Sequence, residues 1–491
     1  MRVSDSGYRS ASAAGLVFLA SGAVLVLEIL GIRLLAPYVG LTLETTTTVI
    51  GTVLAGIAAG AALGGRLADR VADRRLVGGL LAAGGLLALT TVPLLRLLGG
   101  ALEGGGDVAA LVITLVALFP CATVLSAVTP TIVKLQLRDL ETTGSVVGRL
   151  SAWATAGALA GTFTTGFVIV PLVATDVAIL GVGAVLLSVG IAMLVRHGAT
   201  ARKVAVGAAV TAALLVGATA AVGAPCDVES TYHCARIVED PENPTGRALV
   251  LDDLQHSYVD LDDDTHLRFN YTRWIGDAID AMAAPDEALH AVFLGGGGFT
   301  LPRYLAATRP GSASRVLEVD SALIDLNRAR LGLETGPGLA IVIGDARVTL
   351  RREAADSADL VVGDAFGGRS IPWHLATTEF VSDVRRVLRP DGLYALNVID
   401  YGSLDLLRAE AATLLEQFAD VGLIALPDAD GAPSGGNLIL VGSDRLLPEA
   451  LGAPSRGARF YDRGALERLA GGADALRDVD APTDQLLTPE N

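Results

Sequence analysis

The second half of this 491-residue chain contains no lysine. Residues 225–491 hold 23 arginines against 43 aspartates and glutamates, which gives this half a net charge of −20. Residues 1–224 carry 14 basic and 10 acidic side chains, a net charge of +4. Because binding to phosphates requires a basic surface, we expect no nucleic acid partner for the acidic half. The change of composition near residue 224 predicts the main domain boundary.

Cysteine is also scarce, with three in the chain. Cys121 lies in a long apolar stretch, where it is expected to pack as an inert side chain. Cys226 and Cys234 follow the last apolar stretch and are eight residues apart. They form a disulfide if that side of the membrane is oxidising, and they remain two thiols if it is not. We expect no metal site.

Charged residues are rare over the first 224 residues, and long apolar runs take their place. Small residues recur in these runs, as at Gly157, and predict close helix–helix contacts. Pro120 and Pro130 predict a kinked helix. Seven runs are long enough to cross a hydrocarbon layer of about 30 Å as helices. They are 12–36, 45–65, 76–98, 108–133, 151–173, 176–195 and 204–224.

Basic residues in the loops predict the orientation of these helices. The amino-terminal tail and the loops Arg66–Arg75, Lys134–Arg149 and Arg196–Lys203 hold 12 basic residues, whereas the alternate loops hold only Arg96. The positive-inside rule therefore places the amino terminus in the cytoplasm, and seven spans place the second half outside it.

The second half begins with a small β-rich segment, residues 225–290. Tyr232–Val238 and Arg247–Leu251 are predicted to form a hairpin, and a helix at 271–283 follows it. Strands and helices alternate over residues 291–445 and predict a mostly parallel sheet with right-handed crossovers, a Rossmann-like α/β domain. Residues 446–491 are predicted to be an acidic tail.

A glycine-rich turn opens the α/β domain. The apolar run Ala291–Leu294 leads into four glycines, a helical pattern follows, and a second apolar run reaches Glu318. This order is typical of a nucleotide-binding β-α-β unit, in which glycine lets the backbone approach the ligand. We expect Gly295, Gly296 and Gly297 to contact a nucleoside.

Three consecutive predicted strands end in an acid: Glu318, Asp345 and Asp364. Because the carboxyl ends of parallel strands meet at one edge of the sheet, where ligands bind, these acids are expected to lie together. Glu318 suits ribose hydroxyls, Asp345 with Ala346 suits an adenine amino group, and Asp364 faces the reacting end. The alternative is that the acids cap helices.

These motifs resemble the spermidine/spermine synthases, the polyamine aminopropyltransferases, and specifically their membrane-fused type. The resemblance covers about residues 232–399 and includes LGGGG (Leu294–Gly298), LEVD (Leu317–Asp320), GDA (Gly344–Ala346) and VVGDAF (Val361–Phe366). It implies a methyltransferase-type Rossmann fold without a permanently bound cofactor. Decarboxylated S-adenosylmethionine, or S-adenosylmethionine itself, would be the co-substrate.

The resemblance also implies the roles of the acceptor side. Asp364 would be catalytic, taking a proton from the attacking amine, and Tyr271 and Gln255 would bind that amine. Two family acids are replaced by glycine here, at Gly298 in the turn and at Gly367 after Asp364. The replacements leave three interpretations open: another acceptor, a weakened enzyme, or nucleoside binding without turnover.

Alternative functions remain open from the sequence. The same sheet and turn occur in S-adenosylmethionine-dependent methyltransferases, and Pro372–His374 could stack on or gate a substrate. The loop Gly64–Arg75 resembles a cytoplasmic loop of the major-facilitator transporters, so a polyamine-binding transporter or sensor is a further alternative. The expected partners are a small-molecule amine and the lipid bilayer, and a homo-oligomer stays open. The predicted outside location conflicts with a co-substrate that is made inside cells.

Overall fold

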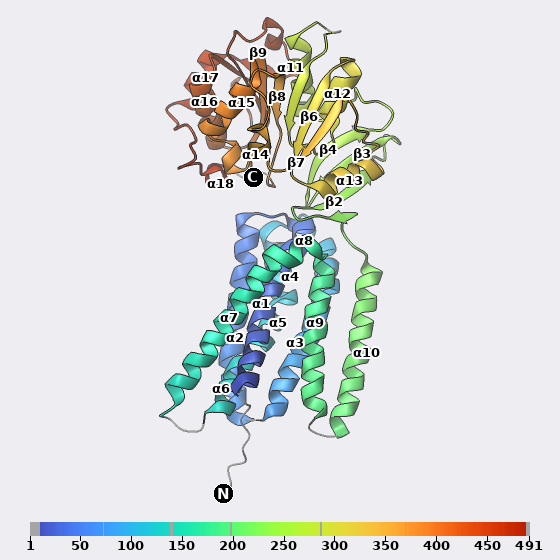
Figure 1. Ribbon diagram of the computed structural model, residues 1–491, viewed down its shortest axis with the longest axis vertical. Coiled ribbons are helices and arrows are strands. Elements are labelled where there is room, and N and C mark those ends of the chain that lie inside the picture. Colours follow the sequence, from blue (N-terminus) through green and yellow to red (C-terminus); the bar gives the residue numbers. More distant parts are fainter. Residues whose placement is uncertain are drawn as a thin grey trace. The chain divides into compact units, whose positions relative to one another are not determined.

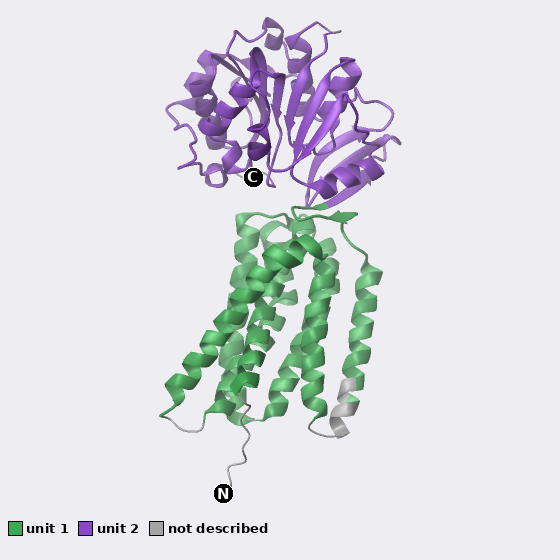
Figure 2. Cartoon of the chain, viewed as in Figure 1, with its two compact units in different colours: residues 1–234 green, residues 235–491 purple. Residues whose placement is uncertain are grey.

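The computed structural model describes residues 10–71, 73–137, 141–196, 199–284, 287–368 and 370–487. The chain divides into two compact units, Met1–Cys234 and Ala235–Asn491 (Figure 2). The first unit is almost entirely helical, and the second combines helices with strands (Figure 1). Arg2, Arg9 and Arg138, three of the basic residues behind the predicted orientation, lie outside the described residues.

Long apolar helices make up the first unit. Within the described residues, six candidate spans have the length and composition to cross a membrane. The described part of the seventh predicted span adds a shorter apolar stretch, Val206–Val222. The helices are α1 (Ser10–Val39), α2 (Leu43–Arg70), α3 (Arg74–Ala101), α4 (Gly106–Ala117), α5 (Phe119–Ser126), α6 (Val128–Gln136), α7 (Thr143–Thr164), the π-helical turn Thr165–Ile169, α8 (Val170–Leu172), α9 (Thr175–Val195) and α10 (Ala199–Val222).

Prolines and glycines shape this bundle as the sequence predicts. The fourth span is divided into α4, α5 and α6, with Pro120 in the first turn of α5 and Pro130 in the first turn of α6. Proline lacks an N–H group and its ring clashes with the preceding turn of a helix, which favours breaks at these positions. A Cβ atom on Gly157 of α7 would lie 2.2 Å from the carbonyl oxygen of Phe18 in α1. The predicted kink and close helix packing are both confirmed.

A small antiparallel sheet begins the second unit. It contains β2 (Cys234–Glu239), β3 (Gly246–Leu251) and β4 (Leu254–Asp260). The β2–β3 hairpin confirms the predicted one. The pairing of β3 with β4 shifts register, because Leu249 pairs with Ser257 while the next residue of β3 pairs with Gln255. His256 is therefore an extra residue, a β-bulge that re-aims the neighbouring side chains.

The large sheet is the framework of the second unit. Its order is β12-β10-β11-β9-β8-β5-β6-β7. The five strands from β9 to β7 are parallel, β11 runs antiparallel between β9 and β10, and β12 is antiparallel to β10. The strands are β5 (His290–Leu294), β6 (Ala313–Glu318), β7 (Leu339–Ile343), β8 (Ala358–Gly363), β9 (Leu388–Asp400), β10 (Asp420–Ala425), β11 (Gly436–Ser443) and β12 (Arg459–Tyr461).

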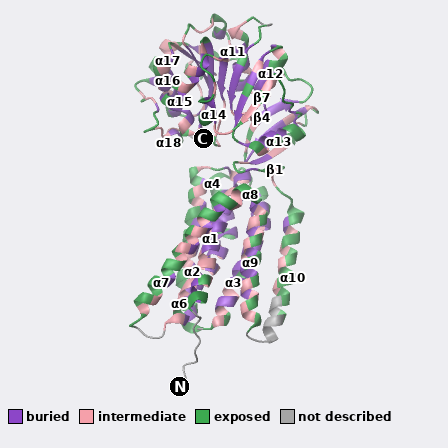
Figure 3. Cartoon of the chain, viewed as in Figure 1, coloured by how far each residue is buried: buried purple, intermediate pink, exposed green. Residues whose placement is uncertain are grey.

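Helices cover both faces of this sheet, and the strands between them are buried (Figure 3). Successive residues of β8 enter the cores on opposite faces of the sheet, Val361 on one face and Val362 on the other, as the two-residue period of a strand requires. The arrangement confirms the predicted Rossmann-like, methyltransferase-type fold. The helices are α11 (Asn270–Met282), α12 (Thr300–Thr308), α13 (Ser321–Arg330), α14 (Ala346–Leu350), α15 (Thr378–Val387), α16 (Asp405–Gln417), α17 (Arg463–Ala470) and α18 (Thr483–Leu486), with 3-10 turns at Trp373–Leu375 and Glu449–Gly452.

Residues 446–487 differ from the acidic tail that the sequence predicts. This segment adds β12 to the sheet, and Tyr461, Leu466 and Leu476 are buried in the same core as α16. The physical reason is that a few apolar side chains, although widely spaced among acids, can pack against the hydrophobic core that the rest of the unit already forms.

Candidate functional site

The glycine turn joins β5 to α12 in a conformation that requires glycine. Gly295 and Gly297 have φ angles of +92° and +50°, a region that side chains disfavour. A Cβ atom on Gly295 would lie 2.6 Å from the carbonyl oxygen of Asp364, and one on Gly297 would lie 2.6 Å from Oγ of Ser257. The turn therefore lies directly against the end of β8 on one side and against β4 on the other.

Glu318, the last residue of β6, holds this turn. One carboxylate oxygen accepts a hydrogen bond from the Gly296 N–H group at 2.7 Å, and the other accepts one from the Asp320 N–H group at 2.8 Å. The side chain is buried, and burial raises the pKa of Glu318. Because a carboxylate has about four acceptor positions, both oxygens retain capacity for ribose hydroxyls. The structure thus brings together the predicted nucleoside-side residues Gly295, Gly296, Gly297 and Glu318.

Asp345 lies at the end of β7 and has two partners. Its carboxylate accepts a hydrogen bond from the Val348 N–H group at 3.1 Å and contacts Nε2 of His374 at 2.8 Å. The first contact caps α14, which begins at the buried residue Ala346. Helix capping, the alternative considered from the sequence, is therefore present at this acid. The Asp345 side chain remains 40% exposed, so it is still accessible to a ligand.

Asp364 follows β8 and lies between two neutral polar side chains. The side-chain amide of Asn397, in β9, donates to its carboxylate at 2.9 Å. Tyr271, in α11, also interacts with this carboxylate, and its hydroxyl donates to the His256 carbonyl at 3.3 Å. Burial raises the pKa of Asp364 to about 6, although the hydrogen bonds of Asn397 and Tyr271 to this carboxylate lower the pKa. Burial and the charge of Asp364 raise the pKa of Tyr271.

Gln255 is the predicted site residue that the structure leaves outside. It is exposed on β4, and within the described residues no hydrogen bond joins it to Asp364 or Tyr271. The bulge at His256 explains the difference, since it changes which side chains of β4 face the glycine turn. Ser257 takes that place, and its hydroxyl accepts a hydrogen bond from the Gly298 N–H group at 2.9 Å.

Ser257 and Asn397 complete the site beyond the predicted residues, and His374 belongs to the segment Pro372–His374 that the sequence offers as a possible substrate gate. Asn397 carried a detectable signal, because it is a lone polar residue within the apolar run of β9 and is almost fully buried. Its partner could not be read from the sequence, since that requires knowing that β8 and β9 are neighbours. Ser257 carried no such signal, because its orientation depends on the bulge.

Comparison with known proteins gives relatives that match part of the chain. No family model matches the chain. A polyamine aminopropyltransferase of Vibrio vulnificus (strain CMCP6) is 26% identical over 170 residues, covering 34% of this chain and 55% of the relative. A polyamine aminopropyltransferase of Chromobacterium violaceum is 28% identical over 142 residues, covering 29% of this chain and 53% of the relative.

A solved structure is similar as well. The crystal structure of a probable spermidine synthase from Corynebacterium glutamicum ATCC 13032 matches with 29% sequence identity and a TM-score of 0.47, covering 50% of this chain and 94% of that one. The chain spans about half the length of the curated relatives that it matches. In sequence, part of this chain is therefore similar to the polyamine aminopropyltransferases, the spermidine synthase family.

Proposed function

We propose that the second unit transfers an aminopropyl group from decarboxylated S-adenosylmethionine to an amine. The observation that carries the proposal is the state of Asp364, a partly buried carboxylate at the ligand edge of the sheet whose pKa is raised to about 6. A base with a pKa close to neutral is suited to accept a proton from a reacting amine.

The reaction needs little from the protein besides position and a base. The acceptor nitrogen, as a free amine, attacks the carbon beside the sulfonium, the carbon–sulfur bond breaks, and a neutral thioether leaves. Asp364 accepts the proton of the amine, which as an ammonium could not attack. Tyr271 and Asn397 orient the carboxylate, and holding the two reactants in line supplies about 7–11 kcal/mol.

The nucleoside part of the co-substrate is assigned to the opposite side of the glycine turn. Gly295, Gly296 and Gly297 bring the backbone close to it, and Glu318 accepts hydrogen bonds from the ribose. Asp345 with Ala346 binds the adenine edge, which requires the carboxylate to exchange His374 for the amino group of the base.

The neutral wall of the acceptor side favours an amine with few charges. Gly298 has no room for a side chain, because a Cβ atom there would lie 2.9 Å from that of Ser257 and 3.2 Å from Cγ2 of Val259. Among the described residues, the side chains that shift the pKa of Asp364 are those of Asn397 and Tyr271, and neither is an acid. One carboxylate balances one ammonium, so we propose that this site accepts singly charged amines better than polyamines.

Calorimetry and product detection test the transfer. Decarboxylated S-adenosylmethionine is expected to bind the full-length protein, and an amine is expected to gain an aminopropyl group by mass spectrometry. Asp364→Asn should retain binding and lower turnover by about 10²–10⁴-fold. Turnover with S-adenosylmethionine instead would support the methyltransferase alternative. Binding without turnover would support a non-catalytic sensor, and the absence of binding to either compound would defeat the proposal.

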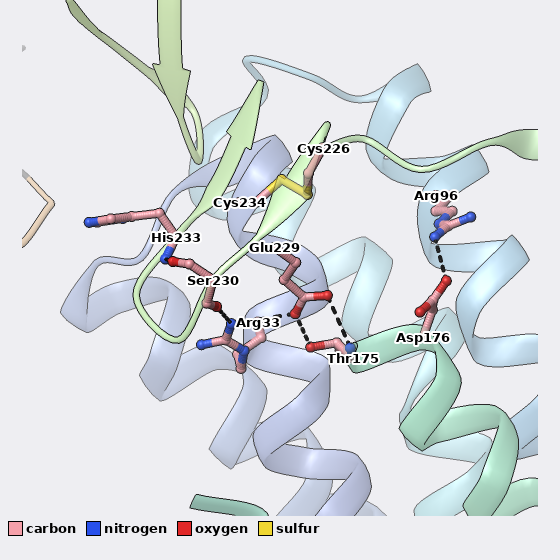
Figure 4. Close-up of a disulfide and its surroundings, with 9 residues drawn as sticks. All are labelled: Arg33, Arg96, Thr175, Asp176, Cys226, Glu229, Ser230, His233 and Cys234. Atoms are coloured by element: carbon pink, nitrogen blue, oxygen red, sulfur yellow. Dashed lines mark hydrogen bonds and ion pairs between the residues drawn. A yellow bond between two sulfur atoms is a disulfide. The ribbon is translucent and has the colours of Figure 1, made fainter. Parts of the chain in front are cut away.

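We also propose that the first unit spans a membrane and that the chain leaves it on the extracytoplasmic side. Arg33, near the end of α1 distal to the amino terminus, donates to the carbonyl oxygens of Ser230 and Thr231 and pairs with Glu229 (Figure 4). Glu229 accepts hydrogen bonds from the N–H group and the hydroxyl of Thr175 at the start of α9. The segment after α10 therefore lies at the end of the bundle opposite the basic loops, which is the result expected if α10 crosses as well.

The cysteines support the same side. Cys226 and Cys234 form a disulfide in this segment (Figure 4), and disulfides persist in oxidising compartments. The second unit would then act on a co-substrate that has left the cytoplasm.

A further inference from the structure

A cavity of about 620 Å³ lies within the helical unit. Its walls are formed by α1, α2, α7 and the consecutive helices α5 and α6, which Figure 1 shows within the bundle. A volume of this size is in the range of small-molecule sites, about 300–1,000 Å³. The cavity contains none of the residues proposed for aminopropyl transfer, so it is a separate feature of the chain.

The cavity opens at the end of the bundle that carries the basic loops. Asp69 and Lys134 line this end, are joined by an ion pair of 2.7 Å, and have side chains that are 67% and 46% exposed. Ile57 lines the far end. The twelve helical positions between Ile57 and Asp69 correspond to roughly 18 Å, so the cavity reaches about the middle of a membrane crossing.

Close helix packing borders the inner part of the cavity. A Cβ atom on Gly56 of α2 would lie 2.8 Å from that of Ala122 in α5, and one on Gly161 of α7 would lie 2.5 Å from the carbonyl oxygen of Gly22 in α1. No ligand can pass between backbones that approach this closely. Its inner end is at the depth where transporters bind their substrates.

Five hydroxyl groups face this pocket without a hydrogen-bond partner among the described residues. Other hydroxyls of the same helices do have partners: Thr123 donates to the carbonyl of Phe119 and Thr131 to that of Ala127, each at 2.8 Å. A hydroxyl exposed to hydrocarbon without a partner costs free energy, so these groups indicate that water or a polar ligand fills the pocket. They belong to Ser21, Ser126, Thr129, Ser151 and Thr155.

The pocket has no net charge. The ion pair of Asp69 and Lys134 balances itself, and the other lining residues are apolar or carry hydroxyls. An ion would lose its hydration here without gaining a counter-charge, which is costly at this depth.

We propose that the first unit is a binding domain as well as an anchor. Its pocket takes a small, hydrogen-bonding solute without net charge that enters from the side of the basic loops. The proposal goes beyond aminopropyl transfer and rests on the membrane placement proposed above.

Cysteine reactivity in membrane vesicles tests the proposal with the full-length protein. Cys121→Ser, which leaves only the disulfide-bonded cysteines, is the background for Ser126→Cys deep in the pocket and Ser151→Cys closer to its entrance. Val185→Cys on α9, an exposed apolar position outside the pocket, is the matched control. The probes are methanethiosulfonates of similar size that carry a hydroxyethyl, a trimethylammonium or a sulfonate group, applied to inside-out and right-side-out vesicles.

The expected result has three parts. Ser151→Cys reacts with the charged probes only in inside-out vesicles. Ser126→Cys reacts with the neutral probe about tenfold faster than with either charged probe, as charge exclusion requires. Val185→Cys reacts with neither charged probe. Reactivity of Ser126→Cys as low as that of Val185→Cys with all three probes would show that the pocket is closed or filled with lipid. If a charged probe reacts at Ser126→Cys as fast as the neutral one, the proposal that the ligand is uncharged is wrong. If labelling occurs from the other side of the membrane, the proposed entrance at the basic loops is wrong.

Discussion

Asn397 donates its side-chain amide to Asp364 at 2.9 Å from the neighbouring parallel strand, and its own side-chain oxygen is buried without a partner. The hydrogen bond stabilises the charged form of Asp364 and lowers its pKa, against the larger effect of burial. Asn397 therefore sets how far the pKa of the proposed base rises above the usual value for aspartate.

Replacing Asn397 with alanine is expected to move the pH dependence of turnover. Activity needs the deprotonated carboxylate, so it is lost as pH falls through about 6 in the unaltered protein. Without the hydrogen bond the charged form is less stable, and this acid limb should move to higher pH by about one unit, since a bond to a charged group is worth about 1.5–3 kcal/mol. The measurement is the rate of product formation against pH.

Asp359→Asn is the control for that experiment. Asp359 is the second residue of the same strand, β8, and pairs with Arg389 away from the site, so this change should leave the acid limb in place. An unshifted limb in Asn397→Ala would show that Asp364 is not the titrating base.

Gly297→Ala is expected to destabilise the second unit and to weaken co-substrate binding. Its φ of +50° disfavours any side chain, and the new Cβ atom would lie 2.6 Å from Oγ of Ser257. The strain is about 1–3 kcal/mol, and it lies in the turn that is proposed to contact the nucleoside. Thermal unfolding of the purified protein and calorimetry with decarboxylated S-adenosylmethionine measure the two effects. Gly336→Ala is the matched control, because that glycine has open space around its Cβ position. Equal unfolding midpoints for the two variants would contradict the strain argument.

The outline of the fold and most of the site followed from local sequence patterns. Glycines after β5 and acids at or just beyond the ends of β6, β7 and β8 mark the ligand edge of a parallel sheet, so Glu318, Asp345 and Asp364 could be selected without the structure. Ser257 could not, because the inserted residue at His256 changes the face of the sheet to which the neighbouring side chains of β4 point. Contacts such as Asn397 with Asp364 depend on strand order. The burial of Tyr461 in the core could not be predicted either, because that core is formed by residues from other parts of the chain.

His374→Ala is expected to strengthen nucleoside binding. His374 occupies the Asp345 carboxylate that the adenine amino group would need, and the pair is partly exposed, with side chains 29% and 40% accessible. Exposed pairs of this kind are worth about 0–1 kcal/mol, so its loss should lower the dissociation constant of 5′-methylthioadenosine by up to about fivefold. His374→Gln keeps a donor and should behave like the unaltered protein. Asp345→Ala should lose binding. If His374→Ala loses binding as Asp345→Ala does, His374 is a ligand contact and not a competitor.

The side of the membrane on which the second unit lies decides which co-substrate it can meet. The disulfide and the contacts of Glu229 with Arg33 and Thr175 place residues 226–234 at the end of the bundle opposite the basic loops. We therefore expect that alkylation of the protein in native membranes without reductant labels Cys121 only after denaturation and leaves Cys226 and Cys234 linked in peptide mass maps. Ser403→Cys, an exposed position in the second unit, combined with Cys121→Ser, should react with an impermeant maleimide from the outside of intact cells. Labelling only in inside-out vesicles, together with two free thiols at 226 and 234, would place the second unit in the cytoplasm, where decarboxylated S-adenosylmethionine is made.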